Sequence, residues 1–480
     1  MAIATRPPTG LQGGDEAYAE SKTIHPRKVK GQFRAYKWWA MGLTLAFWHL
    51  APFMRWDRGP GAPSQAILAD LSGGRGYFFF IEIWPQEVYY ITGLLAISAI
   101  ALFLMSALAG RVWCGFLCWQ TVYTDLFVLV ERLVVGDRNA RIHLERRPWN
   151  ADKLVKRGIV HAAWLVIAAA CGIAFTLFFG NAPDMLVDIL LGREDVAVYG
   201  AIAVVGGCCY LLAGFGREQV CIYMCPYSRF QAAMFDEHSL IVSYEGWRGE
   251  TRGGARRGQS FEGRGHCVDC KMCVVSCPTG IDIRDGSQLA CIGCGLCIDA
   301  CNTMMDRYKL PRGLISYDSS FNLEARAKGE PAKYKLVRSR TVIYTAMIVV
   351  TCAVMAYALA FRKSTEVNIL HERSPLYVQL SDGSIRNGYV YKVLNMVREE
   401  RTFRLQVAAL DDARLSVVGG DSNVATTELK VAPDGVGTFT LFVTAPEAKL
   451  HGKRTPVFFV LTAPDGRQTR SESLFAGPDK

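Results

Sequence analysis

Long uncharged runs constrain this chain more than any other feature. Four of them lie at residues 88–109, 159–180, 196–216 and 341–361, and a shorter one lies at 38–54. A helix rises about 1.5 Å per residue and the hydrocarbon core of a bilayer is about 30 Å thick, so roughly 20 apolar residues cross it. The run at 38–54 is marginal because it contains His49 and Pro52. The sequence therefore predicts a membrane protein with five spans, and it excludes a soluble enzyme and a secreted disulfide scaffold.

The placement of basic residues predicts the topology of these spans. The formal net charge is +10, and Lys and Arg gather at 27–37 and again at 111–157, whereas the loops that follow the first and third spans hold few. Loops rich in Lys and Arg stay in the cytoplasm. We therefore expect an inner-membrane protein with a cytoplasmic N-terminus and a periplasmic C-terminal domain. Because the charge flanks the spans, it indicates contact with the bilayer rather than with nucleic acid.

Composition divides the rest of the chain. Residues 1–36 are polar and rich in Gly and Pro, which predicts a disordered cytoplasmic tail rather than a signal peptide. Residues 37–216 contain four spans, with a periplasmic loop near 66–87. Residues 217–340 form a long cytoplasmic segment in which 245–265 reads as a flexible linker. The fifth span, 341–361, leads to a separate domain at 362–480.

The last domain has the pattern of an immunoglobulin-like β-sandwich. Short β-prone runs alternate with Asp-Gly turns, and several such strands at about 8–12-residue spacing are typical of sandwiches. The runs are 389–397, 402–408, 415–418, 426–431, 438–443 and 457–461.

Eight of the sixteen cysteines form two matching runs. Cys267, Cys270, Cys273 and Cys277 have the spacing C-x2-C-x2-C-x3-C, and Cys291, Cys294, Cys297 and Cys301 repeat it. This is the bacterial two-cluster ferredoxin pattern, in which the fourth cysteine of each run binds the other cluster. We assign one [4Fe–4S] cluster to Cys267, Cys270, Cys273 and Cys301, and the second to Cys291, Cys294, Cys297 and Cys277. The predicted ferredoxin core is 260–312.

Two other interpretations fit these cysteines less well. A zinc site needs a single set of four ligands, and disulfides are rare in the reducing cytoplasm. One residue departs from the usual ferredoxin pattern, because Asn302 stands where many ferredoxins have Pro. Two clusters in one domain predict an electron-transfer protein, and no nucleotide-binding motif is evident. We therefore expect electrons to come from a cytoplasmic donor protein.

Four further cysteines form two C-x3-C pairs. Cys114 and Cys118 follow the second span, and Cys221 and Cys225 follow the fourth. If each helix continues, positions i and i+4 share one face, and two neighbouring pairs would offer four thiols to one metal. Soft thiolates favour Cu(I), zinc or iron–sulfur, so these residues are candidate catalytic and copper-binding residues, with Met224 as a further candidate ligand. The competing interpretation is that they are small packing residues.

The other polar or thiol groups in the spans are weaker candidates. Cys171, Cys208, Cys209 and Cys352 lie within spans, where a thiol behaves as a small hydrophobic group. His49 and His161 are functional candidates because polar groups in spans usually have a role. Interhelical hydrogen bonding explains His49 equally well, and an interfacial position explains His161.

Several motifs together resemble one family. They are WPQ (84–86), WCGFLC (113–118), QTVYTD (120–125), EQVCIYMCP (218–226), CIGC (291–294) and PRGLI (311–315). In these motifs, and over nearly its whole length, the chain resembles the cytochrome c oxidase accessory proteins of the FixG/RdxA/CcoG type. The resemblance implies a membrane-bound dicluster ferredoxin that reduces Cu(II) to Cu(I) during assembly of a cbb3-type oxidase, with copper-delivery and oxidase-assembly proteins as partners. Trp119 departs from the family, which usually has Pro there, so the bend near Cys118 is the local feature to examine.

Three functions remain open at this stage. The first is a membrane cupric reductase and oxidase-assembly factor. The second is a quinol-linked polyferredoxin that feeds another reductase. The third is a redox-sensing scaffold without turnover, whose β-sandwich contacts an oxidase subunit.

Overall fold

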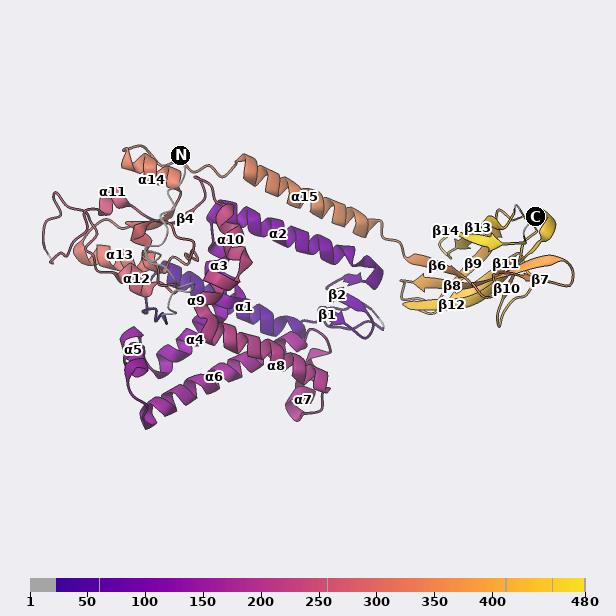
Figure 1. Cartoon of the computed structure of the whole chain (residues 1–480), viewed down its shortest axis with the longest axis horizontal. Coiled ribbons are helices and arrows are strands. Elements are labelled where there is room, and N and C mark those ends of the chain that lie inside the picture. The colour runs from indigo at the N-terminus through magenta and orange to yellow at the C-terminus, as the bar shows by residue number, and fades with distance from the viewer. Residues whose placement is uncertain (1–22, 60, 257, 411, 451, 479–480) are drawn as a thin grey trace, which may run out of the picture. The chain divides into compact units, whose positions relative to one another are not determined.

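A computed structural model describes residues 23–59, 61–256, 258–410, 412–450 and 452–478 (Figure 1). Contacts assign the residues up to Arg58 and Pro63–Met355 to a first compact unit, and they assign Gly59, Gly61, Ala62 and the residues from Ala356 onward to a second. The part of the predicted tail that precedes residue 23 lies outside the described residues. From residue 23 onward the prediction of disorder is wrong, because the Arg27 N–H donates to the Val275 carbonyl at 2.8 Å and a helix begins at Gln32.

The first unit is mainly helical. Its helices are α1 Gln32–Leu50, α2 Tyr89–Ala109, α3 Val112–Phe116, α4 Trp119–Val134, α5 Arg138–Arg146, α6 Ala151–Thr176, α7 Ala182–Leu191, α8 Val196–Leu211, α9 Arg217–Gln219, α10 Pro226–Ala233, α11 Gly246–Gly249, α12 Met272–Ser276, α13 Leu296–Tyr308, α14 Ser320–Ala327 and α15 Ser339–Ala360, the last of which continues into the second unit. Its strands are β1 Ile67–Asp70, β2 Arg75–Phe78, β3 Ile81–Ile83, β4 Ile241–Tyr244 and β5 Ile315–Asp318. Wider helical turns at Leu212–Gly216 and Val220–Met224 extend α8.

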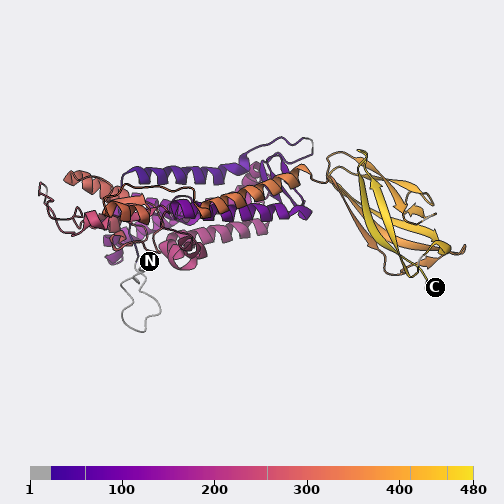
Figure 2. The same ribbon diagram turned by 90° about the horizontal axis from the view of Figure 1, so that it is seen from above.

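Five of the described helical segments are long and apolar enough to cross a membrane. They are Pro85–Ala109, Val112–Val134, Ala151–Thr176, Val196–Met224 and Ser339–Ala360. Four of them coincide with predicted runs, and two of these, α2 and α15, lie side by side, with Met355 packed against Gly93 (Figures 1 and 2). The fifth differs from the prediction, because Val112–Val134 takes the place of 38–54. The predicted run 38–54 lies mostly in α1, whose first turns carry Arg34 and Lys37.

The segment Val112–Val134 is bent, and both of its ends approach the cysteine-rich lobe, which we define as residues 241–318. At one end, a Cβ added to Gly115 would lie 2.9 Å from the carbonyl oxygens of residues 292 and 293. At the other end, Arg132 donates to the carbonyl of Pro26, whose neighbour Arg27 bonds to the lobe. Both ends of the segment therefore lie beside the same lobe, as in a re-entrant segment, whose backbone a membrane tolerates where it is buried in protein.

The helix α1 extends from the cysteine-rich lobe to the end of α6. At its start, Asp299 of the lobe accepts the Arg34 N–H at 2.8 Å, and near its other end Trp48 packs on Phe178, with 5.4 Å between ring centroids. Asp125, in the middle of α4, accepts two bonds from the Arg34 guanidinium at 2.8 and 2.9 Å. This ion pair holds the bent segment against α1.

The cysteine-rich lobe has a small sheet and three helices, α11, α12 and α13. β4 and β5 pair antiparallel, from Ile241 opposite Asp318 to Tyr244 opposite Ile315. They pack with α12 and α13 around an apolar core that includes Ile298 and Met305. The structure differs from the prediction of a flexible linker at 245–265, because the backbone of Cys267 bonds to Gly249 and to Gly253. The part of this segment around Gly249 and Gly253 therefore pairs with the backbone of the lobe.

The predicted loop at 66–87 has structure of its own. β1, β2 and β3 form an antiparallel three-stranded sheet. Leu71, Phe78 and Phe80 are exposed on it, as expected for a loop with an apolar edge at a membrane interface.

The second unit is a sandwich of two antiparallel sheets. Its strands are β6 Thr365–His371, β7 Val378–Gln379, β8 Ser384–Asn395, β9 Arg401–Ala408, β10 Arg414–Val417, β11 Thr426–Val431, β12 Gly435–Pro446, β13 Arg454–Thr462 and β14 Gln468–Ala476. One sheet has the order β10-β12-β8-β6, with β7 on β8, and the other has the order β11-β9-β13-β14. Each of the six predicted runs overlaps a strand, whereas β6, β7 and β14 were not predicted.

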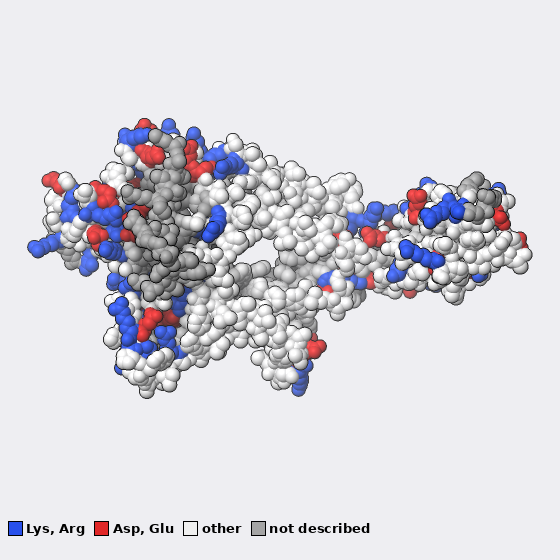
Figure 3. Space-filling view, viewed as in Figure 1, with Lys and Arg blue, Asp and Glu red and all other residues white. Residues whose placement is uncertain are grey.

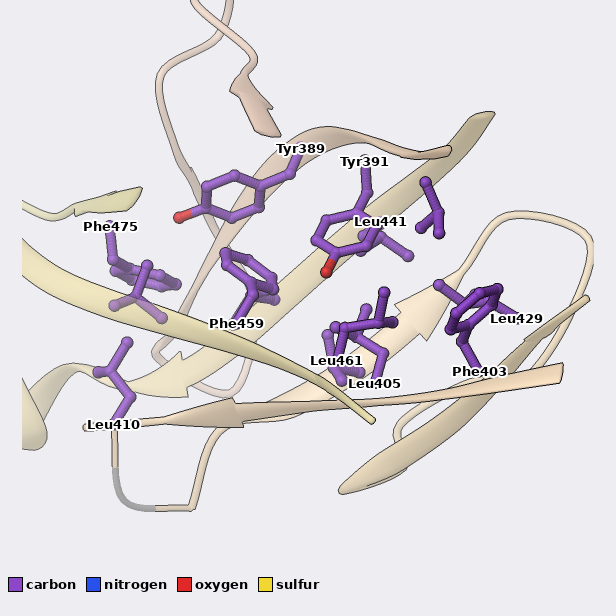
Figure 4. Packing of buried hydrophobic residues seen from close by; sticks show 14 of the residues in the cluster. Tyr389, Tyr391, Phe403, Leu405, Leu410, Leu429, Leu441, Phe459, Leu461 and Phe475 are labelled. Atoms are coloured by element: carbon purple, nitrogen blue, oxygen red, sulfur yellow. The ribbon is translucent and has the colours of Figure 1, made fainter. Parts of the chain in front are cut away.

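Aromatic and aliphatic side chains together fill the space between the two sheets (Figure 4). Tyr389 and Tyr391 of one sheet pack on Phe459 of the other, with centroids 5.1 and 5.6 Å apart. The Tyr389 hydroxyl donates to the Leu474 carbonyl at 2.8 Å, so its polar end is satisfied inside the core.

The bent segment leads to a test of topology. If α1 crosses the membrane and Val112–Val134 does not, a reporter fused after Gly73 faces the side opposite to one fused after Lys309, whereas a reporter fused after Asp137 faces the same side as Lys309. Paired alkaline phosphatase and fluorescent-protein fusions measure this. Same-side activity at Gly73 and Lys309 would show that α1 does not cross.

Candidate functional site

The first four-cysteine set surrounds one cavity in the lobe. Cys267, Cys270, Cys273 and Cys301 line about 340 Å³ of empty space together with Tyr244, Leu314 and Ile315 of the β4–β5 sheet. Cys273 belongs to α12 and Cys301 to α13, so the two helices hold ligands from both runs on one cavity. Cys270 is exposed, whereas Cys267, Cys273 and Cys301 are buried.

The second set surrounds a neighbouring cavity of the same size. Cys277, Cys291, Cys294 and Cys297 line about 340 Å³, and Cys273 reaches its edge. Gly293 and Gly295 have φ of 66° and 69°, a conformation that favours glycine, and they let the chain turn between the cysteines. The eight cysteines are thus divided between two cavities along the lines of the ferredoxin spacing.

The donors suit iron–sulfur clusters. Burial raises the pKa of Cys273, Cys291 and Cys301 to about 12, so each thiol is neutral until a metal displaces its proton. Among the described residues no group of three or more His, Cys, Asp or Glu side chains is arranged for a single metal ion. A cubane instead binds each thiolate at a separate iron, which fits ligands spread around a cavity.

Asn302 has a structural role at the position where many ferredoxins have Pro. The helix α13 continues through it to Tyr308, and its side-chain oxygen accepts the Gly313 N–H at 3.1 Å. Because Asn keeps its own N–H, the helix is not interrupted after Cys301.

The two C-x3-C pairs share one backbone geometry, which differs from the predicted continuous helix. The Cys118 N–H donates to the Trp113 carbonyl at 2.9 Å, and the Cys225 N–H donates to the Val220 carbonyl at 2.8 Å. In each pair the bond joins a residue to the carbonyl five positions earlier and ends a helical turn. The donating cysteine has an extended backbone, with ψ of 127° at Cys118 and 113° at Cys225. A new helix then begins at the next residue.

The bend at Cys118 does not need proline. Trp119 starts α4 as Pro226 starts α10, although only Pro has a fixed φ. Packing of Trp119 against Trp48, with centroids 4.8 Å apart, places the indole. Despite the departure from the family pattern at this position, the first pair has the same backbone geometry as the second.

The two pairs lie together against the loop of the second cavity. Cys114 and Cys221 both pack on the cluster formed by Ile292, Cys294 and Leu296. The thiols of Cys118, Cys114 and Cys225 all lie within electrostatic range of the Cys221 thiol. The structure therefore brings the four cysteines of both pairs to one place, beside a predicted cluster ligand.

Arg111 connects α3 to the same loop. It is 5% exposed, and its guanidinium donates to the carbonyls of Leu289 and, at 3.1 Å, Cys291. The sequence indicated only that Arg111 belongs to a basic loop. Its position three residues before Cys114 was the signal that could have identified it as part of the site.

The weaker candidates lie outside this site. The His49 ring donates to the Leu45 carbonyl at 2.8 Å, and His161 hydrogen-bonds the Tyr210 hydroxyl at 2.9 Å. Cys171 and Cys209 belong to an apolar cluster in the bundle, and Cys208, Cys352 and Met224 are exposed.

Family models match three parts of the chain. Residues 216–320 match a 4Fe–4S dicluster domain, residues 91–135 match a 4Fe–4S binding domain, and residues 355–478 match the IG-like fold at the C-terminus of FixG, described as a putative oxidoreductase. The chain thus carries iron–sulfur domains and an immunoglobulin-like domain. The match at 91–135 includes only one of the C-x3-C pairs.

Three curated relatives are similar over most of the chain. Protein RdxB of Cereibacter sphaeroides is 46% identical over 85% of this chain and 87% of its own length. Protein RdxA of the same organism is 43% identical over 90% of this chain and 91% of its own. The nitrogen fixation protein FixG of Rhizobium meliloti is 42% identical, over 90% and 88%.

The cavities predict the metal content. Anaerobically purified protein should contain about eight iron atoms per chain if only the two cavities hold cubanes, and about twelve if the C-x3-C cysteines hold a third. Cys270→Ser should lower the iron content by up to about four atoms. Iron and zinc analysis with Mössbauer spectroscopy measures this, and Cys352→Ser, at an exposed thiol in α15, is the matched control. Stoichiometric zinc with four or fewer iron atoms would reject the assignment.

Proposed function

The chain belongs to the FixG/RdxA/RdxB family, and from this membership and the geometry of the site we propose that it is a membrane-bound iron–sulfur electron-transfer protein that reduces Cu(II) to Cu(I). The family resemblance inferred from the motifs is thereby confirmed. The ligand assignment remains as the spacing predicts, with Cys267, Cys270, Cys273 and Cys301 for one cluster and Cys277, Cys291, Cys294 and Cys297 for the other. Bound there, the clusters would supply one-electron chemistry.

One observation carries the proposal. Cys114 and Cys221 pack on the cluster that contains Ile292 and Cys294. Because Ile292 and Cys294 also line the second cavity, a substrate on the two thiols would lie on the other side of the wall of that cavity. Arg111 and the close approach at Gly115 fix this contact. The fold therefore holds the electron donor, a cluster in the second cavity, close to the electron acceptor on the C-x3-C thiols.

Thiol chemistry rather than a preformed metal geometry supports copper as the substrate, because no three of the described side chains here are arranged for one ion. Thiolates are soft ligands that favour Cu(I) over Cu(II), so the product of a one-electron reduction is the better-bound state at Cys114, Cys118, Cys221 and Cys225. Each Cu(II) takes one electron, and two singly reduced clusters would supply two copper ions.

A second candidate follows from the match at 91–135. A 4Fe–4S description there favours an iron–sulfur centre on the C-x3-C cysteines. The protein would then relay electrons to another reductase without reducing copper itself.

Sidedness and partners are part of the proposal. Lys and Arg near α5 and the start of α6 favour a cytoplasmic lobe, where a soluble electron donor could reach the exposed Cys270. The β-sandwich would then be periplasmic, facing oxidase-assembly and copper-delivery proteins.

Gly115 provides a test of the contact. Replacing it with Ala puts a methyl group 2.9–3.0 Å from backbone atoms of residues 292–294, so α3 and the loop must separate. A displacement of about 1 Å can cost on the order of 100-fold in rate. We expect Gly115→Ala to keep its clusters but slow Cu(I) formation, measured with a Cu(I) chelator after reduced protein freed of reductant meets Cu(II). Gly42→Ala, where a Cβ meets nothing within 4 Å, is the control, and equal rates in both variants would contradict the proposal.

The four cysteines should act as one site. Single Ser replacements at Cys114 or Cys225 should each abolish copper reduction while the lobe keeps its iron. The double replacement should cost little more than either single one, because residues that act as a unit are non-additive. Cys208→Ser is the control. Additive losses would indicate two separate sites. Unchanged activity would show that these cysteines are only small packing residues.

A further inference from the structure

A second hollow in the first unit lies away from the cysteines. It is a partly open hollow of about 430 Å³ between the end of α4, α5, the start of α6 and α9. Its charged lining consists of Arg141, Arg157 and Arg217 with Glu131 and Glu145, and His25 also faces it. We call it the arginine hollow.

Glu131 is shared by two of the three guanidiniums. It is 7% exposed and accepts from Arg141 Nη1 at 2.9 Å and from Arg217 Nη2 at 2.6 Å. Glu145 is paired with His25, whose Nε2 lies 2.5 Å from the carboxylate. Arg157, half-buried on α6, has no ion pair among the residues that the structure describes.

The shared carboxylate leaves buried donors unsatisfied. Arg217 Nη1 and Arg141 Nε are buried and have no hydrogen-bond partner within the described chain, and these side chains are only 8% and 3% exposed. Buried polar groups without partners are rare and point to an unseen ligand or water. Three guanidiniums in one hollow select an anion with several oxygens, because phosphate accepts forked bonds from Arg.

The position of the hollow indicates where that anion comes from. Arg157 lies where α6 changes from charged residues to the apolar run that begins at Ile159. Leu154, Val155 and Ile159, on the same stretch, are 64%, 59% and 50% exposed, as expected for side chains that meet acyl chains. Lys and Arg also gather on the surface over α5 (Figure 3). Basic pockets of this kind, between helices at the membrane edge, bind anionic lipid headgroups.

We propose that the arginine hollow binds the phosphate of an anionic phospholipid, whose acyl chains lie along the exposed apolar side of α6. The phosphate would satisfy the open N–H groups of Arg141 and Arg217 and pair with Arg157. Because Arg217 lies four residues before Cys221, the lipid would also brace the helix that carries the second C-x3-C pair. This site is independent of whether copper is the substrate.

The test uses the full chain with its clusters, stripped of lipid in detergent. The probes are phosphatidylglycerol, phosphatidylcholine and inorganic phosphate, and the readouts are bound lipid by native mass spectrometry and the melting temperature. The variant is Arg157→Gln, which leaves both bonds to Glu131 in place. Arg146→Gln is the matched control, since Arg146 is exposed on α5 and does not line the hollow. Cluster absorbance shows that each variant is folded.

We expect phosphatidylglycerol to bind and to raise the melting temperature, with little effect of phosphatidylcholine. Loss of one charged contact in Arg157→Gln should weaken binding about tenfold, whereas Arg146→Gln should bind like the parent. Equal binding of the two lipids, or equal weakening in both variants, would overturn the proposal. Stabilisation by inorganic phosphate at least as strong as that by phosphatidylglycerol would assign the hollow to a soluble anion and reject the lipid.

Discussion

The close approach of α3 to the loop at 291–294 is the contact on which the rest of the site depends. Gly115 leaves no room for a side chain there, and Gly293 on the other side would bring a Cβ within 3.2 Å of the Arg111 carbonyl. Two glycines therefore face each other across the interface, and Arg111 closes it with bonds to the loop. Because Cys114 lies beside Gly115, the interface that joins the lobe to the bundle also places the thiols at the second cavity.

Buried ion pairs hold the helices that support this contact. Asp125 joins α4 to α1 through Arg34, and Glu131 joins α4 to α5 and α9 through Arg141 and Arg217. Removing one partner of such a pair costs about 3–5 kcal/mol, because the other charge is left buried and unpaired. These pairs specify how the bent segment Val112–Val134 sits in the bundle, and charged groups in membrane segments usually have such a defined partner.

The sequence predicted local features well and long-range contacts poorly. The cysteine register divided eight cysteines into two sets, and each set lines one cavity, because the spacing determines which thiols can share a cavity. The alternating runs located six strands of the sandwich but missed β6, β7 and β14, and the polar residues of β14 alternate weakly at a sheet edge. The bent segment was missed because its charged residues Asp125, Glu131 and Arg132 are typical of a loop. The residues that pair with two of them are distant in sequence: Arg34 lies 91 residues from Asp125, and Arg217 lies 86 residues from Glu131. The C-x3-C pairs were recognised, but their break from helical geometry depends on a backbone bond that spacing does not reveal.

The most direct test of the central claim is the reaction of the reduced protein with copper. Anaerobic protein, reduced and freed of excess reductant, is mixed with Cu(II) in a stopped-flow instrument while cluster absorbance and Cu(I) capture by a chelator are followed together. If the lobe and the thiols form one electron-transfer unit, cluster reoxidation and Cu(I) formation proceed at the same rate and in equal electron equivalents. Clusters that stay reduced while copper is present, or Cu(I) that forms without cluster reoxidation, would contradict it.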